Sequence, residues 1–376
     1  MNTAAIRIGL WLWVALAIAF SPVQGPCIDQ PIQPSGDPCI QRLLDGVRAA
    51  GDRLDFCGEP VPLAQTDIRE RFEREMLIML GDPAQVLLWL KRSARFSPDI
   101  EAALSQRGMP QDLKFIPVIE SAFLPNAGSS KGAIGHWQFI AETGKRHGLA
   151  VNAAIDERRN PQSATFAALD YLSDLYSQFQ SWTLAAAAYN MGEEGLRTEI
   201  FLQDCRDYYQ LDLPKETQRY VFRIIAAKTI LSHPEKFGFN LGPKDLYPPW
   251  AVRTVSLELR ESTPVLLIAR AANTTFKRIR DLNPQIRGRL LQPGPLSLDI
   301  PLEGTDGFEQ RFESLVQSRT NAGEKGAHIV QKGDSLSLIA AKYNIPLKAL
   351  LMLNRMDAKK NLQPGDRILI SPDAIP

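Results

Sequence analysis

The chain has 376 residues, which is enough for about two or three domains of ordinary size. With 44% hydrophobic and 23% charged residues it has the composition of a globular protein, which excludes a mostly disordered chain, a collagen-like chain and a polytopic membrane protein. A net charge of +1 gives no electrostatic footprint for a nucleic acid, and neither the four histidines nor the four cysteines are spaced as metal ligands. We therefore expect no nucleic-acid partner, no metal and no cofactor.

Residues 1–25 are typical of an export signal. Arg7 precedes an apolar run over residues 8–20, and these 13 residues are fewer than the ~20 that span a membrane. Small residues follow the run. We expect an exported protein of the periplasm or cell envelope. A retained N-terminal anchor and lipidation at Cys27 stay open, and with them an association with the membrane.

The four cysteines all lie beyond this signal, and an even number in an exported chain permits two disulfides. The sequence does not choose among the three pairings of Cys27, Cys39, Cys57 and Cys205, and free thiols are the alternative. Residues 26–65 contain three of these cysteines and are rich in Pro, Gly and Asp. We expect an irregular lead-in there, tied by disulfides.

Residues 66–248 are expected to form an all-helical domain. Apolar residues recur at helical spacing from Ile68 through Phe72 to Met76, with charged residues between them. Asn160 before Pro161 indicates a helix start, because Asn is a capping residue and Pro suits the first helical position. Pro214 begins a further helix. No alternating strand pattern interrupts this span.

The C-terminal third contains two copies of one small module. When residues 262–301 are aligned with residues 333–372 without a gap, 13 of 40 positions are identical, where average composition gives roughly two or three. The repeat predicts a divergent module at 249–305, a flexible linker at 306–325 and a second module at 326–373. In the second copy we expect a strand at 328–331, helices opening at Ser335 and Pro346, and a closing strand at 367–370. This order is βααβ, a small α+β unit.

The second copy resembles a LysM module over residues 328–345 and 353–370, which read HIVQKGDSLSLIAAKYNI and LNRMDAKKNLQPGDRILI. LysM modules bind N-acetylglucosamine units of peptidoglycan or chitin. The resemblance places the glycan groove between two loops, which here are Gly333, Asp334, Ser335 and Leu336 on one side and the stretch from Asn354 to Asp357 on the other. The first copy resembles a divergent LysM, for which glycan binding and a purely structural role both stay open.

Two segments of the helical domain contain candidate functional side chains. Glu120 lies within an apolar run, where burial raises the pKa of a carboxyl group and lets it act as a general acid, although a solvated glutamate at a helix end is the alternative. Gly132 and Gly135 let the backbone approach a ligand closely. Trp137 and Gln138 are suited to stacking on a sugar and hydrogen bonding to it, unless Trp137 is a core residue after a tight turn.

Two more segments follow, an alanine-rich helix that ends in Tyr189 and Asn190 and the stretch 213–221 around Tyr220. In this order the set resembles the lytic transglycosylase family, whose fold is goose-type lysozyme-like, over roughly residues 80–235. The matching words are IESAF, GAIGHWQF, TGKRHGL, DERRNP, AAAAYNMG and LPKETQRYV. One departure is His136, where the family usually has an apolar residue. The expected fold is thus mainly α, a lysozyme-like helical catalytic domain followed by βααβ LysM modules.

The resemblance implies roles for eight residues. Glu120 would be the catalytic acid/base. The implied substrate-binding residues are Ser121 beside it, Gln138 and Tyr189 in the sugar subsite, Asn190 near the glutamate, Tyr220 in the cleft, and Gly135 and Trp137 in its wall.

A mechanism follows from the shortage of carboxylates, because most glycosidases use two and these motifs offer one. Asp156 and Glu157 are explained by helix capping and by ion pairing with Arg158 or Arg159. We expect Glu120 to protonate the oxygen between N-acetylmuramic acid and N-acetylglucosamine and then to accept the proton of the muramoyl C6 hydroxyl. That oxygen closes on C1 as a 1,6-anhydro sugar, and no water or metal is used.

Two other functions stay open. A lysozyme on the same fold would cleave the bond with water. A non-catalytic protein would bind the cell wall through its LysM modules. The expected partner in each case is the peptidoglycan glycan strand, and the oligomeric state is not indicated.

Overall fold

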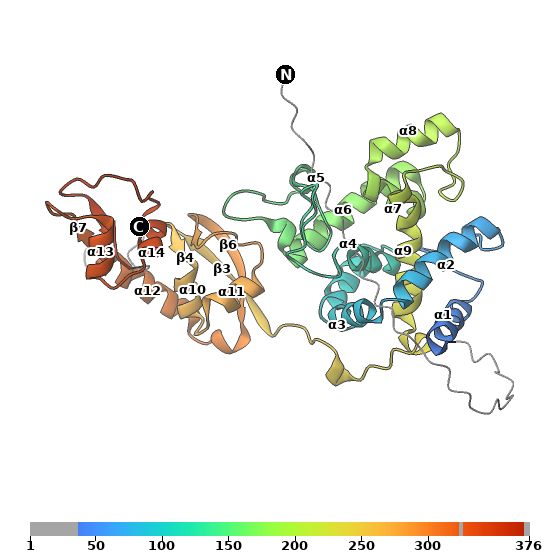
Figure 1. Cartoon of the computed structure of the whole chain (residues 1–376), viewed down its shortest axis with the longest axis horizontal. Coiled ribbons are helices and arrows are strands. Elements are labelled where there is room, and N and C mark those ends of the chain that lie inside the picture. Colours follow the sequence, from blue (N-terminus) through green and yellow to red (C-terminus); the bar gives the residue numbers. More distant parts are fainter. Residues whose placement is uncertain (1–36, 323–325, 372–376) are drawn as a thin grey trace, which may run out of the picture. The chain divides into compact units, whose positions relative to one another are not determined.

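The computed structural model describes residues 37–322 and 326–371 (Figure 1). The expected export signal and Cys27 lie outside the described residues. The chain divides into two units, Met1–Gln41 and Arg42–Pro376, and each is described by itself. Of the described residues, no single helix is both long and apolar enough to cross a membrane, but the bent pair formed by Leu336–Lys342 and Leu347–Asn354 passes that test jointly.

The expected irregular lead-in is wrong at α1 (Pro38–Ala49), which is a helix. Pro38 opens it, and the Asp37 carboxylate accepts a hydrogen bond from the Cys39 N–H at 2.8 Å. A short hairpin follows, formed by β1 (Asp55–Phe56) and β2 (Glu59–Pro60). Cys39, Cys57 and Cys205 are free thiols, so no pair of these three forms a disulfide.

The prediction of an all-helical span from residue 66 onward is confirmed. Between residues 66 and 240 the strand-like pairings are isolated bridges, such as Ile134 with Phe139. The helices are α2 (Thr66–Leu80), α3 (Pro83–Gln106), α4 (Ile116–Ser121), α5 (Ala141–Arg146), α6 (Pro161–Phe179), α7 (Trp182–Met191), α8 (Glu193–Gln203) and α9 (Lys215–Ser232). Short 3₁₀ turns lie at Gln111–Phe115, Glu157–Arg159, Pro234–Phe237 and Pro243–Asp245.

Local sequence signals explain how these helices begin and pack. The side chain of Asn160 accepts a hydrogen bond from the Ser163 N–H at 2.9 Å and caps α6 as predicted. Ser181 caps α7 in the same way. The four alanines at 185–188 are fully buried and let α7 pack closely against α6 and α9, so α7 lies inside the domain.

The first repeat has a core of its own. Its long strands β3 (Val252–Leu259) and β6 (Gly294–Pro301) pair antiparallel, with Val252 opposite Pro301. The two helices expected from the repeat are α10 (Val265–Ala271) and α11 (Phe276–Leu282), and a short pair, β4 (Thr263–Pro264) with β5 (Leu290–Leu291), closes the module. The predicted helix pair is confirmed.

The expected flexible linker at 306–325 is wrong for most of its length, because α12 (Phe308–Ala322) occupies it. Phe308 and Phe312 are buried in the core of the first repeat, stacked on each other with ring centroids 6.0 Å apart. Arg319 also pairs with Glu261 of the same module at 3.2 Å. The apolar residues of this segment recur every three or four positions, so it packs as a helix against α10.

The second repeat has the predicted βααβ order. Strands β7 (Ala327–Ile329) and β8 (Arg367–Leu369) pair antiparallel and enclose α13 (Leu336–Lys342) and α14 (Leu347–Asn354). Together with the helical domain this confirms the expected fold class, mainly α with small α+β modules.

The two repeats also share the hydrogen bonds of one asparagine side chain. The Asn283 amide donates to the carbonyls of Ile279 and Asp299 at 2.9 and 2.7 Å and accepts from the Asp299 N–H at 2.8 Å. Asn354 makes the same three bonds with Leu350 and Leu369, at 2.8, 2.9 and 2.7 Å. Each asparagine therefore ties the second helix of its module to the closing strand.

Candidate active site

Glu120 is held at the last turn of a short, buried helix. Residues 116–119 of α4 are buried, and Pro117 lies in its first turn. The helix ends sharply, because Ala122 and Phe123 both adopt left-handed conformations with φ of 51° and 57°. Two successive non-glycine residues in this region are uncommon and store backbone strain. These two left-handed residues turn the chain sharply immediately after Glu120 and Ser121.

The surroundings of the Glu120 carboxyl group change its pKa. Burial raises its pKa from 4.5 to about 7, and the Glu216 charge adds to the rise, while a hydrogen bond from Tyr220 and the charge of Arg223 oppose it. The Tyr220 hydroxyl donates to Oε1 at 2.5 Å. With a pKa of about 7 the group is populated in both forms at neutral pH, which suits one residue that acts first as acid and then as base. The prediction of a raised pKa is thus confirmed.

Two phenols from neighbouring helices lie near this carboxyl group, and Tyr220 is buried while Tyr189 is half-buried. Tyr220 on α9 and Tyr189 on α7 both have pKa values well above 10, first because of burial and then because of the Glu120 charge. The Tyr189 hydroxyl donates to the Trp137 carbonyl at 2.7 Å. Both phenols therefore stay protonated and act as hydrogen-bond donors at neutral pH.

The glycine loop that carries Gln138 requires its glycine at 135. Gly135 has φ of +86°, and a Cβ there would lie 1.7 Å from the Arg158 carbonyl oxygen. Gln138 adopts φ of 49°, and its side-chain N–H₂ group donates to the carbonyls of Gly135 and Ala127 at 2.8 and 3.3 Å. The loop closes on itself and leaves Gln138 partly exposed.

Three other predicted site residues have their side chains bonded within the protein. Trp137 is 0% exposed and donates from its indole nitrogen to Thr165 at 3.0 Å, so no ring face is left for a sugar and the core alternative holds. The Ser121 hydroxyl lies 2.9 Å from the His136 carbonyl oxygen, to which it donates. Asn190 accepts a hydrogen bond from the Thr217 hydroxyl at 2.8 Å.

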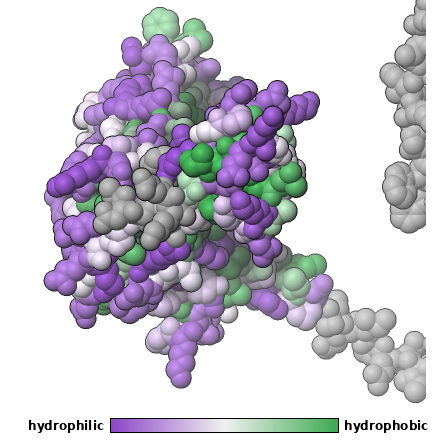
Figure 2. All heavy atoms as spheres, turned by 90° about the vertical axis from the view of Figure 1, so that its left-hand side faces the viewer, coloured by the Kyte–Doolittle hydropathy of each residue, from purple (hydrophilic) through white to green (hydrophobic). Residues whose placement is uncertain are grey.

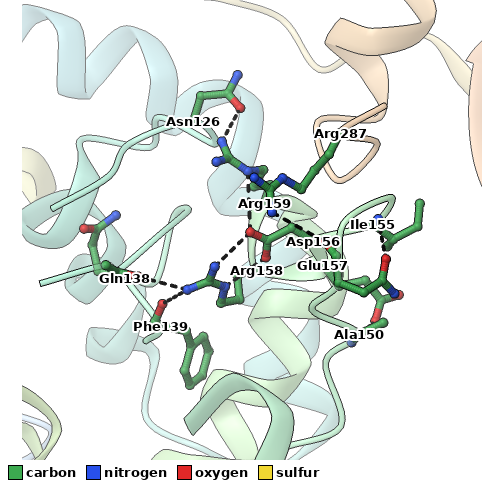
Figure 3. Close-up of polar contacts among 12 residues, drawn as sticks. Asn126, Gln138, Phe139, Ala150, Ile155, Asp156, Glu157, Arg158, Arg159 and Arg287 are labelled. Carbon is green, nitrogen blue, oxygen red and sulfur yellow. Dashed lines mark hydrogen bonds and ion pairs between the residues drawn. The ribbon is translucent and has the colours of Figure 1, made fainter. Parts of the chain in front are cut away.

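A buried ion pair braces this loop (Figure 3). Asp156 is 1% exposed and accepts two bonds from the Arg158 guanidinium, at 2.8 and 2.9 Å. The remaining terminal nitrogen of Arg158 donates to the carbonyls of Gly132 and Phe139 at 2.9 and 3.0 Å. Asp156 is thereby explained by ion pairing, as predicted, and Arg158 holds both ends of the loop that contains Gln138.

Arg223 is a site residue that the sequence analysis missed. It lies one turn after Tyr220 on α9, donates to the Ile119 carbonyl at 3.3 Å, and its charge lowers the pKa of Glu120. The i, i+3 spacing from Tyr220 was the available signal, since it places both side chains on one helix face.

His136, the departure from the family pattern, is a buried neutral residue. Its ring packs edge-on against Phe96 and Phe123, with centroids 4.6 and 5.8 Å away. Burial lowers its pKa to about 3, so it is uncharged at neutral pH. It therefore fills the position of an apolar residue.

In the second repeat, the residues predicted to contact glycan also shape the turn before α13. Gly333 has φ of +96°, and Ser335 caps α13 by accepting a bond from the Leu338 N–H at 3.3 Å. Asp334 accepts from the Gln331 N–H at 2.8 Å and lies 2.6 Å from the His328 ring nitrogen, while Leu336 is buried. The face of the structure in Figure 2 is mainly hydrophilic, with small separate hydrophobic patches.

The described part of the chain has no metal site beside these groups. Within residues 37–322 and 326–371, no three His, Cys, Asp or Glu side chains are grouped so as to hold a metal ion.

Comparison with known proteins identifies two domains. Residues 98–210 match the transglycosylase SLT domain, and residues 328–371 match the LysM domain. The chain is 31% identical over 288 residues to membrane-bound lytic murein transglycosylase D of Escherichia coli (strain K12), an alignment that covers 72% of this chain and 62% of that protein. It is 38% identical over 96 residues to peptidoglycan transglycosylase gp16 of Escherichia phage T7, over 25% of this chain and 7% of that protein.

A solved structure is also similar in part. The 70 kDa soluble lytic transglycosylase Slt70 of Escherichia coli matches 48% of this chain and 32% of its own, with 20% identity and a TM-score of 0.34. The chain spans 62% of the length of its E. coli transglycosylase D relative, less than two thirds. The resemblance drawn from the motifs is confirmed for the transglycosylase domain and for the second repeat.

Proposed function

The chain carries a transglycosylase SLT domain followed by a LysM domain, and from these two domains we propose that it is a peptidoglycan lytic transglycosylase. It cleaves the bond between N-acetylmuramic acid and N-acetylglucosamine and leaves a 1,6-anhydro end. The observation that carries the proposal is the position of the Glu120 carboxyl group, at the end of a buried helix beside the Tyr220 hydroxyl, where burial raises its pKa to about 7.

The reaction uses Glu120 twice and leaves it unchanged. Its proton passes to the glycosidic oxygen as the bond from that oxygen to C1 breaks, and N-acetylglucosamine departs. The carboxylate, still accepting a bond from Tyr220, then takes the proton of the muramoyl C6 hydroxyl, and the C6 oxygen bonds to C1. Because nucleophile and electrophile belong to one sugar, no second carboxylate and no water are needed.

The remaining site residues have two kinds of role in this proposal. Gln138 contacts the sugar from the glycine loop, and the Tyr220 hydroxyl donates to the carboxyl group. The Tyr189 hydroxyl holds the backbone of this loop by donating to the Trp137 carbonyl. Ser121, Gly135, Trp137 and Asn190 position the site through the backbone and side-chain contacts described above.

The second repeat supplies the attachment to the substrate. We place its glycan contacts on the loops shaped by Gly333, Asp334, Ser335, Leu336 and Asn354. A weak module tethered to a weak cleft gains from effective concentration on an insoluble polymer. Because the proposed substrate is the cell wall, we place the protein in the cell envelope. Export through residues 1–25 is part of this proposal.

A solubilisation assay tests the catalytic claim. Dye-labelled sacculi are incubated with the wild type, with Glu120→Gln and with Glu142→Gln, an exposed matched control on α5. Loss of the acid/base is expected to lower the rate by ~10²–10⁴-fold, while the control keeps the wild-type rate. A wild type that binds sacculi but releases no dye would favour a non-catalytic wall-binding protein.

A further inference from the structure

The two repeats differ in the loop that follows their second helix. In the first repeat Asn283, Gln285 and Ile286 are 1%, 5% and 0% exposed. The aligned residues of the second repeat are partly or fully exposed, and Asp357 stands where Ile286 does. Because the two modules share one fold, the difference in exposure indicates that another part of the protein covers this loop in the first repeat only.

The cover is a loop of the catalytic domain. The Asp156 N–H donates to the Gln285 carbonyl at 2.8 Å, and the Arg287 N–H donates to the Ala154 carbonyl at 2.8 Å. Ile155 and Ile286 form an antiparallel bridge between these bonds. The Ile155 side chain packs against the core of the first repeat, and Figure 3 shows Arg287 reaching toward the same loop.

This contact is linked to the active-site loop by a short series of bonds. The backbone of Asp156 is held by Gln285, while its carboxylate holds Arg158. Arg158 in turn donates to Gly132 and Phe139, on either side of Gln138. The docked loop is therefore connected by hydrogen bonds to the segment that carries Gln138.

We propose that the first repeat is an intramolecular docking module, which braces the 150–157 loop of its own catalytic domain and does not present this loop to glycan. The proposal rests on the proposed function, because the 150–157 loop leads through Asp156 and Arg158 to the segment that carries Gln138. The second repeat alone keeps its corresponding loop exposed for a sugar polymer.

Hydrogen–deuterium exchange of the full chain tests the docking. In the wild type, residues 283–288 are expected to exchange at least ~10-fold more slowly than residues 354–359. Ile155→Asp removes the apolar contact, and exchange is expected to rise at least ~10-fold in residues 283–288 and also to rise in residues 132–139. Ile155→Val and Ile78→Asp, the latter at an exposed isoleucine on α2, should leave both segments protected. Unchanged protection of 179–191 in Ile155→Asp confirms that the domain is folded.

Two results would overturn the proposal. One is fast exchange of 283–288 in the wild type, and the other is an Ile155→Asp variant that leaves 283–288 or 132–139 unchanged.

A second arm adds an N-acetylglucosamine oligomer to the Glu120→Gln full chain. Slower exchange at 333–336 and 354–357 without any change at 283–288 is the expected result, and protection at 283–288 contradicts the proposal. Protection of neither loop would instead count against glycan binding by the second repeat, while the Ile155 variants still decide the docking.

Discussion

The state of Glu120 at the start of the reaction decides how the rate depends on pH. The general acid must be protonated, and burial raises its pKa to about 7, so the rate is expected to fall as pH rises above about 7. An ordinary carboxyl group near 4.5 would be almost wholly ionised at that pH and would be a poor acid. The buried setting of α4 is therefore part of the chemistry.

Tyr220→Phe gives a prediction with a defined sign. The Tyr220 hydroxyl stabilises the Glu120 carboxylate and so lowers the pKa of Glu120 against the effect of burial. Removal of that hydroxyl should raise the pKa, and the alkaline limb of the pH–rate profile should move to higher pH. The profile is measured by sacculus solubilisation from pH 5 to pH 9. A limb that moves to lower pH would contradict the assignment of this bond.

The sequence could predict part of this site. Glu120, Gln138, Tyr189 and Tyr220 belong to motifs whose order is informative, and the apolar run before Glu120 indicated its burial. The orientation of Trp137 could not be predicted, since a residue type that stacks on sugars is also one that fills cores. Its buried indole nitrogen donates to Thr165, which is 28 positions away in sequence.

At the level of the elements, the glycine loop depends on an arginine outside it. Arg158→Met removes both hydrogen bonds from the Arg158 guanidinium to the buried Asp156 carboxylate, and breaking a buried pair in this way costs about 3–5 kcal/mol. The free energy of unfolding, measured in urea, should fall by that amount, and the activity should fall with it. Arg159→Met is the matched control, because the Arg159 side chain is more exposed and lies 3.7 Å from Asp156. A loss below about 1 kcal/mol in Arg158→Met would show that the loop is not braced by this pair.

Helix periodicity predicted most elements, and its failures have physical reasons. α12 lies in the segment that joins the two copies of the repeat, for which a linker is the simple prediction, although Phe308 and Phe312 mark an apolar face. The Pro, Gly and Asp residues around α1 favour an irregular segment, but Pro38 is a helix-starting residue.

At the level of the whole molecule, the second repeat should matter only on a polymer. Deletion of residues 326–376 ends the chain after α12 and leaves the cores of the catalytic domain and the first repeat intact. The rate on intact sacculi should fall at least ~10-fold, since the tether supplies effective concentration. The rate on short soluble glycan fragments should stay the same, and an equal loss on both substrates would contradict a targeting role.

The repeat itself could be predicted from identities at a constant offset, but the docking of its first copy could not. That contact consists mainly of backbone bonds between residues 154–156 and 285–287, and backbone groups leave no mark on the side-chain pattern. The sequence indicates the docking at one position, where the first copy has the apolar Ile286 and the second copy has Asp357.

The most direct test of the central claim is the mass of the muramoyl ends released from purified sacculi by the full chain. Intramolecular attack by the C6 hydroxyl predicts 1,6-anhydro ends, lighter by one water than reducing ends, and none from Glu120→Gln. Reducing ends released by the wild type would mean that water is the nucleophile, and the single-carboxylate mechanism would be wrong.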